Sequence, residues 1–399
     1  MSSKHQKTKK VKTVQQKKKL FRANEPLLSV FMWGVNYSIT GLSHVDEPSL
    51  LLPEHFKAFA KVRVDNNQYN KENMPSHFKF KEYCPLVFRN LRERFNIYDD
   101  EFMNSLTKSQ PIDQNETSGK SGARFFMSQD KLYVIKTVTS EEVEAIHTLL
   151  AEYHQHVVER HAKTLLPQYL AMYRVTVNDT ETYMLVMKNV FSPYRTIHTK
   201  YDIKGSLIDR TATEKEKSKE LPTFKDVDLI NDDVKINIGE LAKEEFLETL
   251  ALDVNWLTKL KLMDYSLLIG IHDYNRAMVE AEQQELEENG TNESSDDGEL
   301  SSSPGARAAT PPHSPLTYLS RNPNVDPDWD QFAVKASTES DKPIFYYMAL
   351  IDILTHYGMK KRTANAAKQV KHGSGAEIST VKPEQYAKRF TEFVSKVII

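Results

Sequence analysis

Asp352 closes the apolar run Ile344–Ile351 and carries a carboxylate whose position calls for a cation. Such a run predicts a buried strand, and an unpaired carboxylate at its inner end would be costly. Mg²⁺ is the natural partner, because sites that hold nucleotide phosphates bind this ion through one or two carboxylates. The alternative is a structural aspartate that is paired with a basic side chain.

Asp264 is a second lone aspartate, between a predicted helix and the strand-like run Tyr265–Ile271. The negative end of a helix dipole disfavours a carboxylate, so a purely structural turn residue is the less favoured interpretation of Asp264. Phosphoryl transfer depends mainly on positioning and charge neutralisation. Two carboxylates at the ends of two strands could therefore supply a catalytic residue and a metal ligand.

Lys136 interrupts the β-branched and apolar run Lys131–Val138, just after a stretch that contains two glycines. That stretch contributes Gly119, Lys120, Ser121 and Gly122. In nucleotide-binding sheets, a strand lysine beneath a glycine turn reaches the α- and β-phosphates. Most Gly-x-x-Gly turns are ordinary hairpins, so a lysine on the exposed face of a strand is the alternative.

A long helix must lie directly after this lysine. Apolar residues recur every three or four positions over Val143–Val157, and acidic residues precede them, which predicts a helix from Ser140. In a kinase-like lobe this helix carries the glutamate that holds the lysine. The pattern leaves four candidates open, which are Glu141, Glu142, Glu144 and Glu152.

The remaining elements follow from periodicity and from turn residues. The stretches 169–177 and 182–191 predict a strand pair, one edge of which could receive a base. The stretch 200–210 is charged and predicts an irregular loop, a kind of segment that often carries function. Helical periodicity returns over 240–262, and 383–394 predicts a terminal amphipathic helix that begins at a proline.

The composition excludes several classes of protein. The chain has 399 residues and a formal net charge of -2, which argues against a general binder of polyanions such as nucleic acid. Cys84 is the only cysteine, so we expect neither an internal disulfide nor a cysteine-based zinc site. No apolar run approaches the roughly 20 residues that span a bilayer. We expect a protein of the cytosol or the nucleus.

Two segments lack the apolar residues that a folded core needs. Residues 1–25 are rich in lysine and predict a disordered tail, which could be attracted to anionic lipid, direct nuclear import or merely aid solubility. Residues 277–341 are acidic and then rich in serine and proline, and predict a disordered insert. A basic segment, 360–371, follows Asp352 and suits contact with phosphate.

An ordered set of motifs carries a resemblance to a known family. The set comprises Gly119-x-x-Gly122, Val134-Ile135-Lys136, Tyr201-Asp202-Ile203-Lys204-Gly205-Ser206, Met263-Asp264-Tyr265-Ser266-Leu267-Leu268 and Ile351-Asp352-Ile353-Leu354. With these motifs, and without His-Arg-Asp or Asp-Phe-Gly, the chain resembles the phosphatidylinositol phosphate kinases from about Pro26 onward. The stretches 222–226 and 371–381 resemble the type II branch, the phosphatidylinositol-5-phosphate 4-kinases.

The resemblance implies a fold and a nucleotide site. The fold is α+β, two-lobed and kinase-like, with an antiparallel sheet in an N-lobe of about 26–190 and a smaller mixed C-lobe of about 191–399. Asp264 is implied as the catalytic-loop aspartate, Lys136 as a catalytic contact to ATP, and Asp352 as the Mg²⁺ ligand. The implied ATP-binding residues are Gly119, Lys120, Ser121, Gly122, Lys136, Met187, Asn189 and Val190.

The resemblance also implies a lipid substrate. The residues implied to meet it are Lys204, Arg210, Ala364, Lys368 and Lys371. Ala364 matches a position that is alanine in the 4-kinases and glutamate in the 5-kinases, so we expect ATP to phosphorylate the 4-hydroxyl of phosphatidylinositol 5-phosphate. The alternatives are a phosphatidylinositol-4-phosphate 5-kinase and a weakly catalytic membrane scaffold. Some members that use GTP well have threonine in place of Met187, so the use of GTP stays open.

The implied partners complete the set of expectations. Besides the phosphoinositide substrate, the resemblance implies an anionic membrane surface that receives a flat basic face, and a second copy of the chain in a homodimer. No nucleic acid is expected. The expected location is the cytoplasm, peripheral on membranes, or the nucleus.

Overall fold

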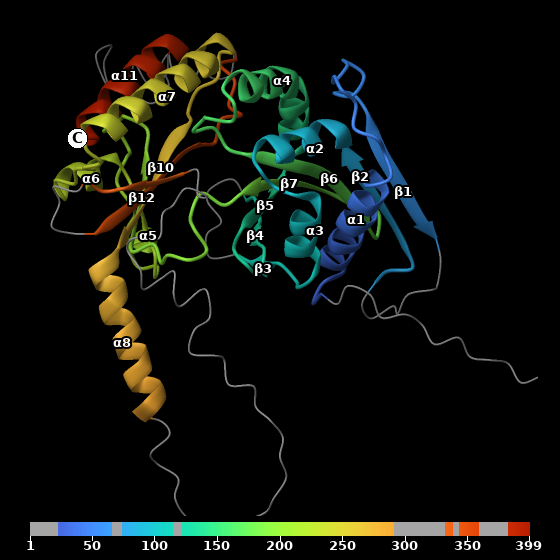
Figure 1. The fold of residues 1–399 in the computed structure, drawn as a ribbon, viewed down its shortest axis with the longest axis horizontal. Coiled ribbons are helices and arrows are strands. Elements are labelled where there is room, and N and C mark those ends of the chain that lie inside the picture. The colour runs from blue at the N-terminus through green and yellow to red at the C-terminus, as the bar shows by residue number, and fades with distance from the viewer. Residues whose placement is uncertain (1–22, 66–73, 115–121, 291–331, 338–342, 359–381) are drawn as a thin grey trace, which may run out of the picture.

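Two β-sheets, each with its own helices, form the body of the protein in the computed structural model (Figure 1). The structure describes residues 23–65, 74–114, 122–290, 332–337, 343–358 and 382–399, and for 284–290 the backbone alone. The first sheet ends at Lys188 in sequence and the second begins at Thr199. The fold is thus mixed α and β, as expected from the sequence.

The first sheet is antiparallel throughout, in the order β1-β2-β6-β7-β5-β4-β3. Its strands are β1 (Phe59–Asp65), β2 (His77–Tyr83), β3 (Ile112–Asp113), β4 (Phe125–Met127), β5 (Tyr133–Val138), β6 (Tyr169–Val177) and β7 (Thr180–Lys188). Asn178 and Asp179 join β6 to β7 with φ of 48° and 59°, the left-handed values of a tight hairpin turn. The predicted strand pair is confirmed, and β7 lies between β6 and β5 in the described sheet.

Four helices belong to this sheet: α1 (Pro26–Leu42), α2 (Pro85–Arg94), α3 (Asp99–Thr107) and α4 (Ser140–Glu159). Helix α1 packs closely on β2, since a Cβ atom at Gly34 would lie 2.0 Å from the ring of Phe80. Helix α4 begins where the sequence predicts. Thr139 and Glu142 form a capping box there, in which each side chain accepts a hydrogen bond from the backbone of the other.

The second sheet is mixed, in the order β11-β12-β10-β8-β9. Its strands are β8 (Thr199–Ile203), β9 (Thr223–Phe224), β10 (Ser266–Asp273), β11 (Ala333–Lys335) and β12 (Ile344–Ile351), of which β8 and β9 alone run parallel to each other. Strands β10 and β12 are mostly buried, which is why both are nearly continuous apolar runs. Part of the charged stretch 200–210 is therefore a strand and not an irregular loop.

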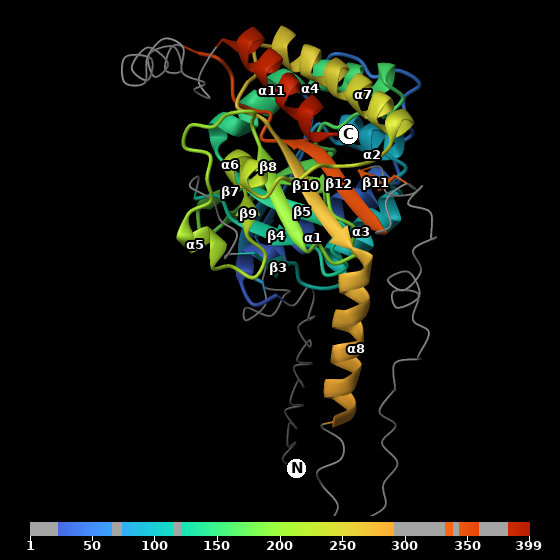
Figure 2. The same cartoon turned by 90° about the vertical axis from the view of Figure 1, so that its left-hand side faces the viewer.

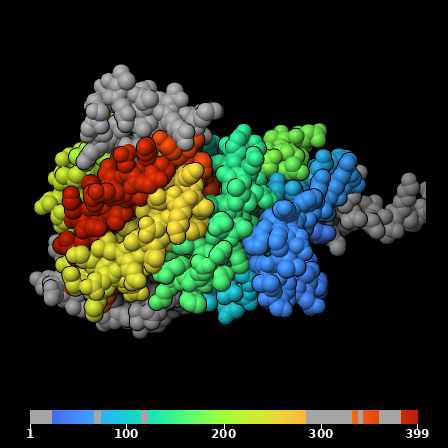
Figure 3. Space-filling model, turned by 90° about the horizontal axis from the view of Figure 1, so that it is seen from above, coloured from blue at the N-terminus to red at the C-terminus, as the bar shows by residue number. Residues whose placement is uncertain are grey.

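The helices of the second sheet are α5 (Glu214–Lys217), α6 (Asp226–Asn231), α7 (Glu240–Lys259), α8 (Tyr274–Gly290) and α11 (Pro383–Val397). Helices α7 and α11 confirm the predicted helices, and they lie side by side on the surface (Figure 3). Among the residues that the structure describes, we find no helix with the length and apolar character needed to cross a membrane.

Helix α8 and strand β11 correct the predicted bounds of the disordered insert. The helix continues to Gly290 and projects from the body (Figure 2), and β11 pairs with β12. The segment is polar but rich in alanine, glutamate and glutamine, which are good helix formers, and Arg276 Nε lies 2.7 Å from Glu280 Oε1 one turn later. Lack of apolar residues therefore did not exclude a helix here.

Candidate active site

Lys136 projects from the middle of β5, opposite Phe125 on one side and Leu185 on the other. Its Nζ lies 3.4 Å from Glu142 Oε1, and its side chain is 15% exposed. The structure thus selects Glu142 from the four glutamates that the sequence left open. The other oxygen of Glu142 accepts a hydrogen bond of 2.8 Å from the backbone N–H of Thr139. The helix cap therefore fixes the carboxylate that holds the lysine.

The two aspartates lie at the same end of the second sheet. Ser266 at the start of β10 pairs with Ile351 at the end of β12, so Asp264 and Asp352 lie just beyond the same end of these two paired strands. Both have left-handed backbones, with φ of 63° and 57°. The backbone at each aspartate therefore departs from the extended conformation of a strand, just before the chain enters β10 and just after it leaves β12.

Asp352 is not buried, contrary to the expectation from the sequence. Its side chain is 59% exposed, and its Oδ1 lies 3.8 Å from Lys136 Nζ. The apolar strand ends one residue earlier, and the turn at Asp352 removes the carboxylate from the strand interior. Burial therefore does not require Asp352 to have a cation as a partner. Its position beside Lys136 nevertheless agrees with a site that binds phosphate.

The predicted ATP-binding residues are described only in part. Gly119, Lys120 and Ser121 lie outside the described residues. Gly122 has φ of 69°, a value that favours glycine. Met187 is half-buried and lies opposite Val134, and Val190 is half-buried as well.

Asn189 ties the chain after β7 to the start of β5. Its backbone N–H donates to Leu132 O at 2.8 Å, and its side-chain amide donates to Lys131 O at 2.9 Å. These bonds fix the segment 189–190 against the strand that carries Lys136. The predicted ATP-binding role of Asn189 stays a prediction, and its side chain already has this structural contact.

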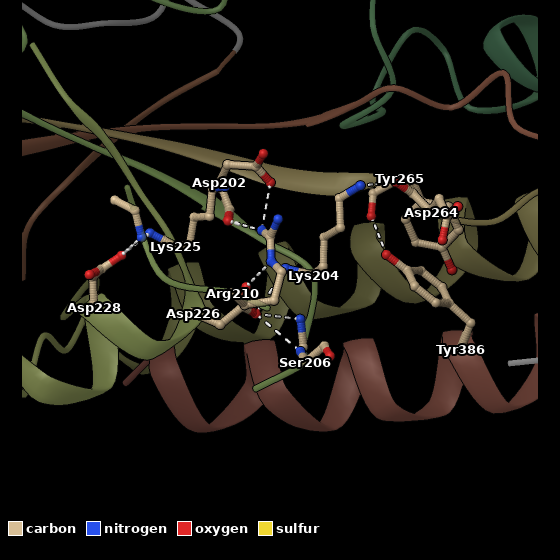
Figure 4. Close-up of polar contacts among 12 residues, drawn as sticks. Asp202, Lys204, Ser206, Arg210, Lys225, Asp226, Asp228, Asp264, Tyr265 and Tyr386 are labelled. Carbon is tan, nitrogen blue, oxygen red and sulfur yellow. Dashed lines mark hydrogen bonds and ion pairs between the residues drawn. The ribbon is translucent and has the colours of Figure 1, made fainter. Parts of the chain in front are cut away.

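Asp226 organises the turn that follows β8, although its sequence context did not predict a role in the site. Its Oδ1 accepts the backbone N–H groups of three successive residues, Lys204, Gly205 and Ser206, at 3.0, 2.6 and 3.2 Å (Figure 4). Its Oδ2 accepts from Arg210 Nε at 2.7 Å. The side chain is fully buried. The one signal in the sequence was its place in the stretch 222–226, which marked the branch of the family.

Arg210 lies in this network and is buried. Besides Asp226, it contacts the backbone carbonyl and Oδ1 of Asp202, the latter at 3.0 Å. Burial acts to lower the pKa of Arg210, but Asp202 and Asp226 outweigh it and raise the pKa. Two carboxylates already pair with the guanidinium through Nε and Nη2, so the structure gives Arg210 a part in shaping the turn.

Lys204 links this turn to the turn that carries Asp264. Its Nζ donates a hydrogen bond of 2.7 Å to the backbone carbonyl of Asp264. One predicted substrate residue thus touches the predicted catalytic turn. Of the other four, Arg210 is paired as described above, and Ala364, Lys368 and Lys371 lie outside the described residues.

The described groups suit the binding and transfer of a phosphoryl group. Lys136 supplies a positive charge, Asp352 an exposed carboxylate, and Asp264 a second carboxylate at the same sheet edge. Within the described ranges, no cluster of three or more His, Cys, Asp and Glu side chains could enclose a metal ion. Mg²⁺ needs no such cluster, because it takes one or two carboxylates and completes its shell with phosphates and water.

Comparison with known proteins gives the family. Residues 106–397 match the family model of the phosphatidylinositol-4-phosphate 5-kinases. Phosphatidylinositol 5-phosphate 4-kinase type-2 alpha of Gallus gallus is 56% identical over 98% of this chain and 96% of its own length. The type-2 alpha protein of Homo sapiens is 55% identical over the same shares, and its type-2 beta protein is 53% identical over 96% of this chain and 92% of its own. The chain therefore belongs to the phosphatidylinositol phosphate kinases, in the branch of the phosphatidylinositol 5-phosphate 4-kinases.

Proposed function

We propose that this protein transfers the γ-phosphoryl group of ATP to the 4-hydroxyl of phosphatidylinositol 5-phosphate, giving phosphatidylinositol 4,5-bisphosphate. The observation that carries the reaction class is the meeting of Lys136, from the first sheet, with Asp352, from the second, at 3.8 Å. Asp264 stands at the same edge. The choice of lipid is supported by the names of the relatives.

Each residue then has a distinct task. Lys136, held by Glu142, binds the α- and β-phosphates of ATP. Asp352 holds Mg²⁺, which when bound neutralises charge on the phosphates. Asp264 orients the attacking hydroxyl, and Lys204 contacts the phosphate that the lipid already carries.

A basic face on the first sheet supports binding to anionic membrane. Lys61 of β1 lies opposite Lys81 of β2, which in turn lies opposite Arg174 of β6. Burial and then the two basic neighbours lower the pKa of Lys81. Like charges opposite each other destabilise a sheet, and an anionic lipid surface would relieve the repulsion. We place the protein at cytoplasmic membrane surfaces, with the nucleus as the alternative.

The free edge of the same sheet supports a homodimer. β1 ends the order of described strands, and Phe59 at its start is 58% exposed. Its outer N–H and C=O groups could pair with β1 of a second copy, a common use of an exposed edge. Light scattering at micromolar concentration tests this proposal, since an edge-paired chain should have about twice the monomer mass.

A transfer assay with two lipids and two nucleotides tests the function. We expect product from phosphatidylinositol 5-phosphate with ATP, and much less from phosphatidylinositol 4-phosphate. Preference for the latter lipid would identify a 5-kinase, and no product from either would leave a membrane scaffold. The measurement with GTP tests whether a chain with methionine at position 187, where members that use GTP well have threonine, can also use GTP. If Ala364→Glu leaves the lipid preference unchanged, the specificity argument from Ala364 is wrong.

A further inference from the structure

Helix α11 lies against the two turns that form the centre of the candidate site. A Cβ atom added to Gly205 would lie 3.0 Å from the Cα of Phe390 and 3.2 Å from the backbone oxygen of Arg389. The Lys204–Ser206 turn therefore rests directly on the backbone of the helix. Gly205 has φ of 67°, so glycine is required both by the contact and by the conformation.

Tyr386 reaches from the same helix to the other turn. Its ring is fully buried and meets the ring of Tyr265 edge-on at 4.8 Å. Its hydroxyl donates a hydrogen bond to the backbone carbonyl of Tyr265, the residue after Asp264 (Figure 4). Burial, followed by the nearby Tyr265 and Asp264, raises the pKa of this hydroxyl well above its usual value. The hydroxyl is therefore protonated, and a donor, at any physiological pH.

Two side chains thus hold the two successive carbonyl groups at Asp264. Lys204 donates to the carbonyl of Asp264 itself, and Tyr386 donates to that of Tyr265. Asp264 needs such support, because its φ of 63° is unfavourable for a residue with a side chain. Of the two donors, Lys204 also has a proposed substrate contact, whereas Tyr386 is remote from solvent.

We propose that Tyr386 is a positioning residue for Asp264, acting through the carbonyl of Tyr265 to keep the aspartate aimed at the reacting hydroxyl. This inference rests on the proposed role of Asp264. It assigns the terminal helix a part in catalysis besides packing. The helix is anchored elsewhere as well, since Ile236 N–H donates to Val397 O at 2.9 Å, so loss of one hydroxyl should not release it.

Tyr386→Phe in the full chain tests the proposal, because phenylalanine keeps the ring and removes only the donor. We expect kcat to fall about tenfold, with the KM for ATP and for the lipid unchanged within about twofold. Tyr153→Phe is the matched control. The Tyr153 hydroxyl, also buried, donates to the backbone carbonyl of Pro167 at 2.7 Å and accepts from the backbone N–H of Tyr169 at 3.2 Å, and neither partner belongs to the turns at Lys204 and Asp264. The control should keep wild-type kcat.

Hydrogen exchange gives a readout that does not depend on turnover. Tyr386→Phe should speed exchange in residues 262–266 and leave 391–397 protected, since the turn loosens while the helix stays docked. An unchanged kcat together with unchanged exchange at 262–266 would overturn the proposal, as would an equal loss of kcat in Tyr153→Phe. A wild-type chain that is inactive on both lipids would instead overturn the proposed function, and the exchange result would still decide whether the hydrogen bond from Tyr386 to the Tyr265 carbonyl holds the turn.

Discussion

Lys136 Nζ lies 3.8 Å from Asp352 Oδ1, so a cation on the first sheet faces a carboxylate at the end of a strand of the second sheet. The separation exceeds that of a close charge-assisted hydrogen bond, about 2.7–2.9 Å. Lys136 is nearer to Glu142, at 3.4 Å, and Asp352 is mostly exposed. The carboxylate is therefore accessible to a metal ion, whereas the lysine is 15% exposed and its long contact with Asp352 leaves it able to bind a phosphate instead.

Replacement of Lys136 by methionine should abolish turnover without unfolding the protein. Methionine has a similar length and keeps the packing beside Phe125, but it cannot bind a phosphate. We expect kcat/KM to fall by at least about 100-fold, as the loss of a charged transition-state contact predicts. A transfer assay with purified protein measures the loss, and thermal unfolding within about 2 °C of wild type serves as the control for folding. Activity above about a tenth of wild type would exclude a phosphate contact.

Glu142→Gln separates the two tasks of this glutamate. Glutamine still forms a capping box, so the stability of α4 should change little, but the charge that holds Lys136 is lost. We expect the KM for ATP to rise several-fold and the free energy of unfolding to change by less than about 0.5 kcal/mol.

Thr139→Ala is the matched variant for this prediction. It removes the side chain that accepts from Glu142 N at 3.2 Å and leaves the charge pair in place. We expect a loss of about 1 kcal/mol in the free energy of unfolding with a smaller effect on the KM for ATP. If both variants changed the KM equally, the cap and the charge pair could not be separated as we argue.

The sequence predicted those parts of the fold that have strong periodicity or strong turn chemistry. Helix α4 and the β6–β7 hairpin appear within a few residues of the predicted bounds. Helix α8 was missed because its support comes from helix propensity and a surface ion pair, and not from an apolar stripe. Asp352 was expected to be buried because the pattern gives the strand but not the backbone turn that ends it.

The sequence predicted the site residues whose side chains bear the chemistry, but it did not predict which side chains contact one another in the folded protein. Lys136 and Asp352 do meet, but the choice of Glu142 depends on the direction of the first turn of α4. Asp226 lies 20 residues or more from the backbone groups that it holds, so no local pattern could reveal that contact. The motif alone likewise could not show that Arg210 is already paired.

Asp253→Asn should weaken the contact between α7, a helix of the second sheet, and α4, a helix of the first. The buried carboxylate on α7 contacts His156 Nε2 of α4 at 2.7 Å, and it accepts from Thr164 Oγ1 at 2.9 Å and from Leu165 N–H at 2.6 Å. Asparagine replaces one acceptor oxygen by a donor. We expect a loss of about 2–4 kcal/mol in the free energy of unfolding, measured with urea.

A matched surface variant controls for the change of charge. Asp209→Asn alters an exposed residue and should change the free energy of unfolding by less than about 0.5 kcal/mol. A loss as small as this in Asp253→Asn would show that the buried contacts do not stabilise the protein.

Binding to anionic vesicles should depend on the basic face and on salt. Lys79 lies two residues before Lys81 on β2 and therefore shares this face. Replacing Lys61 and Lys79 by alanine removes two charges from the face, at about 1 kcal/mol each near a charged membrane. We expect roughly 30-fold weaker binding to vesicles that contain phosphatidylserine, and weaker binding of the wild type as salt rises. Lys163→Ala, at an exposed site beyond the end of α4, should bind almost as well as wild type. Salt-independent binding would exclude the basic face as the membrane contact.

Glu82 gives the stability of the first sheet a definite dependence on pH. Burial raises its pKa to about 7, although Arg92 and a hydrogen bond with Ser38 act in the opposite direction. The unfolded chain has the ordinary value of 4.5, so between about pH 4.5 and 7 the folded protein retains a proton that the unfolded chain releases. The contribution of Glu82 to the free energy of unfolding is therefore fully present at low pH and is lost as the pH rises through 7.

Glu82→Gln tests this dependence, because glutamine mimics the protonated acid, and Arg92 keeps its contact with Asp99 at 2.8 Å. The variant and the wild type should be similar in stability at pH 5. At pH 8 the variant should be more stable than the wild type by about 1–3 kcal/mol, because its side chain has no charge to bury. Urea unfolding at both pH values measures the difference. A difference that is the same at pH 5 and pH 8 would show that Glu82 does not titrate in this range.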